Sequence, residues 1–157
     1  MSEDDLLLDQ QLCFKLYTAS RLIIRRYRPM LEALGITYPQ YLVLLVLWEW
    51  QRCPPVQCTV KALGQRLLLD SGTLTPLLKR LQSLGLLTRQ RDREDERAVC
   101  LQLTAAGLAM REQAMRLRQQ LLCQQGLDTP AMQAWRLALG EQLQPLLALA
   151  DEATGSV

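Results

Sequence analysis

The chain has 157 residues, of which 49% are hydrophobic and 22% are charged, and its formal net charge is +2. That length suits one domain of ordinary size, and the apolar fraction is ample for a hydrophobic core. The sequence contains no histidine, which excludes any site that needs a histidine base or ligand. The small net charge does not indicate nucleic acid by itself, because that signal lies in local clusters of basic residues.

The cysteines are spread through the chain, at Cys13, Cys53, Cys58, Cys100 and Cys123. They form no CxxC pair, so we expect neither a zinc site nor another cofactor, and their odd number argues against a secreted disulfide framework. No apolar run approaches the ~20 residues that span a membrane, and the acidic start lacks the basic residues of a signal peptide. We therefore expect a cytoplasmic protein without a membrane partner, whose thiols are kept reduced.

The N-terminal part of the sequence predicts two helices. The first is expected to begin near Asp4 or Asp5, because carboxylates suit the positive end of the helix dipole. Pro29 is expected to kink or interrupt this helix, and Gly35 to end it. The second helix is predicted over residues 39–50, and because it is apolar on most faces it should be buried.

A short helix is predicted over residues 60–68, with Thr59 as its cap. The helix after it contains Pro76. Proline is well tolerated only in the first turn of a helix, because a backbone N–H at that position would have no acceptor within the helix. A cap at Thr73 therefore fits better than a cap at Ser71.

The most informative part of the sequence comes next. A helical run at 72–84 leads to a strand-like piece at 86–91, a charged stretch at 92–97 and a second strand at 99–103. In the second strand apolar and polar residues alternate, which is the period of a half-buried strand. Helix, strand, charged tip and strand are the pattern of a winged helix-turn-helix, so the predicted fold is mainly α with a small β-wing.

Two long helices are predicted after the wing. The first runs from 104 to about 125 and is ended by Gly126, and the second runs from Pro130 to about 150 with Asp128 or Thr129 as its cap. We expect a single domain over residues 1–157, in which a DNA-reading part at 38–104 lies between flanking helices at 5–35 and 105–150. The flanking helices carry more leucine than one small module can bury. A symmetric homodimer is the simplest way to cover that leucine.

The helix before the wing carries candidate DNA contacts. Its leucines occupy the core side, which leaves Thr73, Thr75, Lys79 and Arg80 on the outer side. Short hydroxyl side chains near a helix N-terminus suit phosphates or base edges, and the two cations suit backbone phosphates. The alternative is a plain amphipathic helix with solvated charges.

In the wing, Arg93 and Arg97 are candidates for the minor groove, and Asp95 can orient the Arg97 guanidinium. Glu94, Asp95 and Glu96 favour the alternative of a solvated loop with compensating charges, because acidic residues repel phosphate.

A second candidate site is centred on Cys13, with Tyr17 one turn further along the same helix face. Tyr27 shares that face but lies roughly 21 Å away along a straight helix, so it cannot touch Cys13 of its own chain. Across an antiparallel dimer, Tyr27 of one chain can lie beside Cys13 of the other, and Tyr38 can join it. Phenolic O–H groups aimed at sulfur favour the thiolate, the form that attacks a peroxide. The alternative is a small core cysteine.

Residues 69–81, the charged run 92–97 and residues 103–107 together resemble MarR-type transcriptional regulators. The resemblance covers the central half of the chain. It implies a dimeric winged helix-turn-helix repressor that binds a near-palindromic operator in double-stranded DNA. It also implies a wing-tip role for Arg97 and DNA contacts for five residues of the preceding helix, Ser71, Thr73, Thr75, Lys79 and Arg80.

The segment around Cys13, together with Tyr27 and residues 37–41, resembles the OhrR branch of that family, the organic-hydroperoxide sensors. The resemblance implies that Cys13 is the peroxidatic thiol, and that Tyr27 and Tyr38 hydrogen-bond it from the partner subunit. Two routes after oxidation stay open: a disulfide with Cys123 of the partner, which is favoured, or capping by a small thiol.

These features predict a repressor, not an enzyme, that releases its operator when an organic hydroperoxide oxidises Cys13. One alternative is a MarR-type regulator switched by a non-covalent aromatic ligand in the dimer cleft, with Cys13 inert. A thiol peroxidase is a poor alternative, because no Arg or Thr beside Cys13 forms a peroxide-activating site.

Overall fold

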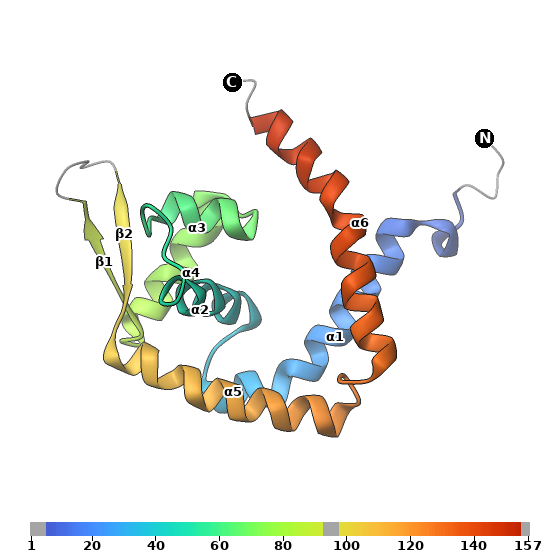
Figure 1. The fold of residues 1–157 in the computed structure, drawn as a ribbon, viewed down its shortest axis with the longest axis horizontal. Coiled ribbons are helices and arrows are strands. Elements are labelled where there is room, and N and C mark those ends of the chain that lie inside the picture. The colour runs from blue at the N-terminus through green and yellow to red at the C-terminus, as the bar shows by residue number, and fades with distance from the viewer. Residues whose placement is uncertain (1–5, 93–97, 155–157) are drawn as a thin grey trace. The chain divides into compact units, whose positions relative to one another are not determined.

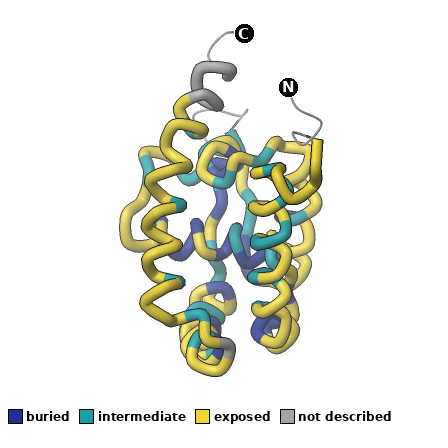
Figure 2. Tube along the Cα trace, turned by 90° about the vertical axis from the view of Figure 1, so that its right-hand side faces the viewer, coloured by how far each residue is buried: buried dark blue, intermediate teal, exposed yellow. Residues whose placement is uncertain are grey.

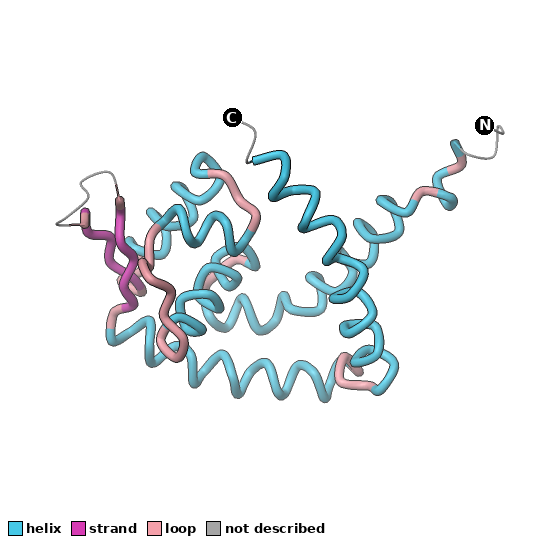
Figure 3. Tube along the Cα trace, turned by 45° about the horizontal axis from the view of Figure 1, so that its top comes forward, coloured by secondary structure: helices cyan, strands magenta, loops and turns pink. Residues whose placement is uncertain are grey.

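The computed structural model describes residues 6–92 and 98–154, apart from the side chains of residue 125 and residues 149–154. After a 3-10 turn at Leu8–Gln10, the elements in chain order are α1 Leu12–Leu34, α2 Tyr38–Trp50, α3 Val60–Leu67, α4 Ser71–Ser83, β1 Leu87–Arg91, β2 Val99–Leu103, α5 Ala105–Gln125 and α6 Pro130–Thr154 (Figure 1). The two strands form one antiparallel hairpin, and the other elements are helical (Figure 3). The predicted fold class, mainly α with a small β-wing, is confirmed.

The chain packs into two compact units, residues 1–118 and residues 119–157. The first unit holds α1 to α4, the wing and most of α5, and the second holds the end of α5 and α6. The expected organisation, with a DNA-reading part at 38–104 and dimerisation helices at 5–35 and 105–150, stays a prediction. Within the described residues no one helix combines the length and apolarity to cross a membrane, although α1 and α2, bent by 75° at their junction, pass that test as a pair.

The first helix begins later than expected. The predicted start near Asp4 or Asp5 is wrong, because Gln11 has extended backbone and separates the 3-10 turn from α1. Pro29 does not interrupt α1, whose last turns are anchored by the buried side chains of Met30 and Leu31. The predicted end is confirmed, since Gly35 adopts the left-handed conformation, with φ 67°, that glycine tolerates without strain.

Helix α2 forms the centre of the first unit, as its apolar sequence predicts. Val43 and Leu44 have no exposed surface, and Trp48 is also buried. The helix starts at a cap in which the Thr37 N–H donates to the Gln40 side chain at 2.9 Å. Figure 2 shows the buried positions as dark blue segments among largely exposed helices.

Helix α4 starts earlier than its proline predicts. The expected cap at Thr73 is wrong, because the Asp70 side chain caps the helix and accepts from the Thr73 N–H at 2.9 Å. Pro76 therefore lies in the second turn, where it leaves the Gly72 carbonyl without its helical N–H partner. Both residues are exposed, so water can satisfy that carbonyl.

The wing is held by pairing that runs from Leu87↔Leu103 to Arg91↔Val99. Its base is fastened to α5, because the Thr104 hydroxyl donates to the Gly85 carbonyl at 2.6 Å and accepts from the Gly107 N–H at 3.1 Å. The Trp48 indole N–H also donates to the Gly107 carbonyl at 2.9 Å. The core helix α2, the wing base and α5 therefore share one hydrogen-bonded junction.

The helix ends after the wing follow the sequence closely. Gly126, with φ 63°, ends α5 as predicted. Thr129 caps α6 by accepting from the Met132 N–H at 3.2 Å, with Pro130 at the first helical position. The helix continues to Thr154, a little beyond the expected end near Ala150.

Candidate functional site

Helix α4 presents one apolar and one polar face, as predicted. Leu74, Leu78 and Leu81 are at most 1% exposed, and they fix the helix on the core. The opposite face is exposed and carries the five predicted contact residues, Ser71, Thr73, Thr75, Lys79 and Arg80. That face can therefore meet a DNA groove without unfolding the module.

The two threonines on this face are held in place by hydrogen bonds inside the helix. The Thr73 hydroxyl donates to the Asp70 carboxylate at 2.8 Å, and the Thr75 hydroxyl donates to the Ser71 carbonyl at 2.6 Å. The hydrogen bonds from Thr73 hold the pKa of Asp70 below its usual value. Both hydroxyl protons are used, so the oxygens face solvent as acceptors, which suits base amino groups better than phosphates.

Asp70 was not among the expected site residues, although Asp directly before a helix is a common cap. Arg89 was missed as well: its Nε donates to the Gln82 side chain at 2.7 Å and ties β1 to the end of α4. The predicted tip residues Arg93, Asp95 and Arg97 lie outside the described residues.

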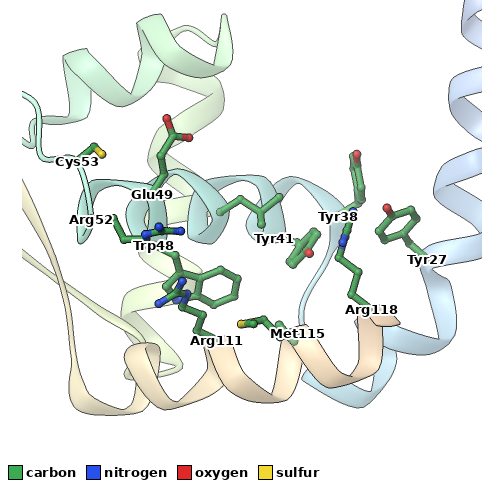
Figure 4. A pocket seen from close by; sticks show the side chains of 12 residues that line it. Tyr27, Tyr38, Tyr41, Trp48, Glu49, Arg52, Cys53, Arg111, Met115 and Arg118 are labelled. Atoms are coloured by element: carbon green, nitrogen blue, oxygen red, sulfur yellow. The ribbon is translucent and has the colours of Figure 1, made fainter. Parts of the chain in front are cut away.

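The structure brings Tyr27 and Tyr38 together, as the sensor hypothesis requires. Their ring centroids lie 5.8 Å apart in an edge-to-face contact. Tyr41 lies 6.4 Å from Tyr38, and Trp48 lies 6.2 Å from Tyr41. The ring centroids of Tyr27 and Tyr41 are also 6.3 Å apart, so the three tyrosines form one cluster, which Trp48 extends along α2 (Figure 4). These four residues are called the aromatic row below.

Burial shapes the chemistry of this row. It raises the pKa of both Tyr38 and Tyr41, and the charge of Arg118 opposes the shift at Tyr41. Both phenols therefore keep their protons at neutral pH and act as hydrogen-bond donors.

Cys13 and Tyr17 lie away from this aromatic row within one subunit. Cys13 is exposed in the first turn of α1, and the helix is continuous up to Tyr27 and beyond. Tyr17 is 60% exposed, with the Arg21 guanidinium 5.4 Å above its ring. Cys123, in the last turn of α5, is also exposed.

The aromatic row forms one wall of a cavity of about 570 Å³ within the first unit. The other walls come mainly from the end of α2 and the exposed side of α5, and the lining residues are Tyr27, Tyr38, Tyr41, Leu45, Trp48, Glu49, Arg52, Cys53, Arg111, Ala114, Met115 and Arg118. A cavity of this size and mixed character fits a small organic ligand.

Cys53 is exposed like Cys13, whereas Cys58 and Cys100 are half-buried. Burial raises the pKa of the Cys58 and Cys100 thiols, and Cys100 donates to the Asp92 carboxylate at 3.3 Å. Both thiols are therefore less reactive, since the thiolate is the nucleophile. Across the described residues no cluster of three or more Cys, Asp or Glu side chains is arranged to hold a metal ion.

Comparison with known proteins agrees with this geometry. The family model of the transcriptional regulators SarA/Rot matches residues 25–113, more than half of the chain. The organic hydroperoxide resistance transcriptional regulator of Bacillus subtilis (strain 168) is 51% identical over 112 residues, which are 71% of this chain and 73% of that protein.

Two solved structures of AbfR, a protein of Staphylococcus epidermidis, share the fold. Reduced AbfR bound to DNA aligns with a TM-score of 0.74 and 35% identity, over 94% of this chain and 99% of AbfR. Disulfide-formed AbfR aligns with a TM-score of 0.61 and 35% identity, over 92% of each chain. The chain therefore belongs to the SarA/Rot family of winged-helix transcriptional regulators.

Proposed function

We propose that this protein is a MarR-type repressor of the OhrR-like branch, which binds its operator as a homodimer and releases it when an organic hydroperoxide oxidises Cys13. The observation that carries the proposal is the contact between Tyr27 and Tyr38, 5.8 Å apart at the end of a ligand-sized cavity. The Bacillus subtilis relative is named for organic hydroperoxide resistance, which supports the choice of signal.

The sensor requires two subunits. Cys13 and Tyr27 are fourteen residues apart on one continuous helix, so an antiparallel pairing of α1 helices places Cys13 of one subunit beside the tyrosines of the other. The first half of α1 is suited to such pairing, because Leu12 and Leu16 are 67% and 40% exposed. Tyr17, on the same face as Cys13, belongs to this contact in the proposal.

The chemistry at Cys13 is a two-electron oxidation. The thiolate attacks the outer peroxide oxygen, an S–O bond forms, and the O–O bond breaks. The sulfur becomes a sulfenic acid, and the peroxide leaves as an alcohol that has taken up a proton. The phenols of Tyr27 and Tyr38 donate hydrogen bonds to the thiolate and hold it for attack.

The oxidised sulfur then condenses with a second thiol. Cys123 of the partner subunit is the favoured thiol, because it is exposed and lies near the end of α5. Its sulfur displaces the sulfenic oxygen as water and forms a disulfide. The bond requires Cα atoms within about 7 Å, so it moves the terminal helices and changes the spacing of the two α4 helices, which must match half-sites about 34–36 Å apart.

The DNA contacts in this proposal come from Ser71, Thr73, Thr75, Lys79 and Arg80 on α4, with Arg93, Asp95 and Arg97 at the wing tip. The exposure of the α4 face supports the first set. For the wing, Arg97→Ala is expected to weaken operator binding strongly in a mobility-shift assay at fixed salt. Unchanged operator binding by Arg97→Ala would show that the wing tip does not contribute to DNA binding.

The test of the sensor is operator binding before and after cumene hydroperoxide. Cys13→Ser is expected to bind DNA like the native protein and to stay bound after treatment. Cys58→Ser, the matched control at a half-buried thiol outside the cavity lining, is expected to release DNA normally. Release of DNA by Cys13→Ser at the same dose shows that another residue senses the oxidant.

Non-reducing gels test the resolving thiol. Native protein treated with hydroperoxide is expected to run as a covalent dimer, and Cys123→Ser as a monomer. If the dimer persists in Cys123→Ser but vanishes in Cys58→Ser, the partner thiol has been misassigned. A mixed disulfide on Cys13, found by mass spectrometry in place of the dimer, supports capping by a small thiol.

The cavity also favours a second candidate function, a switch by a non-covalent aromatic ligand. Its aromatic wall and its volume of about 570 Å³ suit such a ligand. In that case a ligand without a peroxide group releases DNA from Cys13→Ser as readily as from the native protein.

A further inference from the structure

Two arginines of β1 lie on the face of the wing that turns toward α4. Arg89 and Arg91 are two residues apart in the strand, so their side chains share one face of the hairpin with Leu87. That face packs against α4, because Leu87 is 1% exposed and the Arg89 Nε donates to the Gln82 side chain at 2.7 Å. The strand therefore places two cations between α4 and the wing tip.

Gln82 fixes one of these arginines beside the DNA-facing side of α4. It lies seven residues after Thr75 and three after Lys79, so the three side chains share one side of the helix. The hydrogen bond from Arg89 thus ties β1 to the side of α4 that carries two of the expected DNA contacts.

Both arginines are available to an anion. Gln82 uses only the Nε–H of Arg89, and among the described residues the two Nη atoms make no ion pair or hydrogen bond. Arg91 is exposed and pairs with no carboxylate in the described part of the chain. The adjacent carboxylate, Asp92, accepts from the Cys100 thiol at 3.3 Å on the opposite face of the hairpin.

We propose that Arg89 and Arg91 bind two neighbouring phosphates of the DNA strand that passes between α4 and the wing, and that Gln82 is the positioning residue for Arg89. The inference rests on the operator-binding part of the proposed function. It adds three residues that the expected set of DNA contacts lacks.

The path of the DNA supports this assignment. A helix in the major groove and a wing in the adjacent minor groove are separated by one sugar–phosphate backbone. Side chains between α4 and the wing tip therefore meet phosphates, which position a protein on DNA without reading its sequence. Side chains two residues apart in a strand are about 7 Å apart, which is close to the spacing of successive phosphates along one DNA strand.

The amide of Gln82 suits the positioning role. An arginine side chain has many rotamers, and a hydrogen bond that orders it before DNA arrives lowers the entropy cost of binding. Gln82 is neutral, so it orients the guanidinium without neutralising its charge. The charge of Arg89 therefore remains available for a phosphate.

Neutralising the phosphates one at a time tests the proposal. The reduced full-length protein first selects a duplex of about 30 base pairs, long enough for two half-sites, from a random library. Single uncharged methylphosphonates are then placed at each backbone position of one half-site. The native protein is expected to lose about tenfold in affinity at two neighbouring positions, because each loses a charge-assisted hydrogen bond.

The arginine variants assign these two positions. Arg89→Gln is expected to be insensitive to the methylphosphonate at one position, and Arg91→Gln at the other, because the contact is already absent. Each variant loses a contact in both half-sites, so the slope of log affinity against log salt is expected to fall by about two. Arg91 is exposed, so its variant tests the proposal even if the half-buried Arg89 also contributes to folding.

A third variant isolates Gln82, and a fourth controls for charge. Gln82→Met removes the acceptor and is expected to bind about threefold more weakly with a nearly native salt slope, because Arg89 keeps its charge but loses its fixed orientation. Its methylphosphonate effect at the Arg89 position is expected to shrink. Arg28→Gln removes the same charge from an exposed position on α1 and is expected to stay within about twofold of native, because remote charges are screened.

The outcomes separate the inference from the function on which it rests. If Arg89→Gln and Arg91→Gln respond to every methylphosphonate as the native protein does, the phosphate contacts are wrong and operator binding still stands. If Gln82→Met keeps the native affinity and the native methylphosphonate pattern, Gln82 has no positioning role. If the reduced native protein selects no duplex, the proposed function is wrong, and the inference fails with it.

Discussion

Helix α4 and the first half of α1 carry the same sequence signal, leucines at helical spacing, with opposite results. In α4 the leucines are covered within the subunit, and Leu74, Leu78 and Leu81 are at most 1% exposed. In α1, Leu12 is 67% exposed and Leu22 is 54% exposed. The leucines of α4 are therefore buried within the winged module, whereas leucines in the first half of α1 remain exposed. In the proposed dimer, a second subunit covers the exposed leucines of α1.

The largest expected effect is on the winged module. Leu81→Ala is expected to lower the free energy of unfolding by about 2–5 kcal/mol, because it removes a fully buried side chain and leaves a cavity. Chemical denaturation measures the change, with Leu84→Ala, at a position 37% exposed, as the milder control. If both variants lose the same free energy of unfolding, the difference in burial between Leu81 and Leu84 does not determine stability.

The second prediction concerns the exposed face of α1. Leu16→Glu is expected to weaken the dimer by at least about tenfold in Kd, because burying a leucine contributes about 1.5–3 kcal/mol and a buried carboxylate opposes association. Sedimentation velocity measures the dimer, and circular dichroism checks that the helices remain. Val56→Glu, at a fully exposed loop position, is the control and should dimerise normally. An unchanged dimer places the interface elsewhere.

Two glycines test the same contrast between the tightly packed winged module and an exposed terminal helix. A Cβ on Gly107 would overlap the Leu86 carbonyl oxygen at the base of the wing, whereas a Cβ on Gly140 in α6 meets nothing within 4 Å in the chain. Gly107→Ala is therefore expected to cost about 1–3 kcal/mol, and Gly140→Ala to be neutral or stabilising by up to about 1 kcal/mol. Thermal unfolding of the two variants measures this difference in stability. If Gly107→Ala is as stable as the native protein, the backbone at the base of the wing can shift to make room for the added methyl group.

The smallest expected effect is the pH dependence of the α4 cap. The Thr73 hydrogen bonds lower the pKa of Asp70, so its ionised form stabilises the folded state above the ordinary Asp pKa. That contribution is lost as the pH falls through the lowered pKa. Asp70→Ala is thus expected to have a lower Tm than native protein at neutral pH, and this gap in Tm is expected to narrow as the pH falls below the ordinary Asp pKa. Asp70→Asn keeps a capping oxygen without a charge, so it separates the effect of the cap from the effect of its ionisation. A Tm difference between native protein and Asp70→Ala that does not change with pH contradicts the prediction.

The local sequence signals were sufficient for most of the architecture. The alternating strand at 99–103, the glycines after α1 and α5, and the caps at Thr59 and Thr129 led to the observed elements, because each acts within a few residues of itself. The spacing of Cys13 and Tyr27 also excluded their contact in one subunit, since a helix has a fixed rise per residue.

Where two local signals competed, the sequence alone misled. Pro76 favoured a late start for α4, and Asp70 favoured an early one. The folded helix follows Asp70, which binds both the N–H and the hydroxyl of Thr73. In the same way, the acidic residues near the chain start favoured a helix before Gln11, which instead has extended backbone.

The sequence by itself determined the fold class and the residues at the outer face of α4, because helix and strand periodicity decide which side chains turn away from the core. Only the tertiary structure decided that Tyr27, Tyr38, Tyr41 and Trp48 form one row, and that arginines of α5 line the cavity beside it. Arg111 is far from Tyr27 in sequence, and no local pattern links them. They share a cavity because α1, α2 and α5 pack together, and that packing depends on contacts distant along the chain.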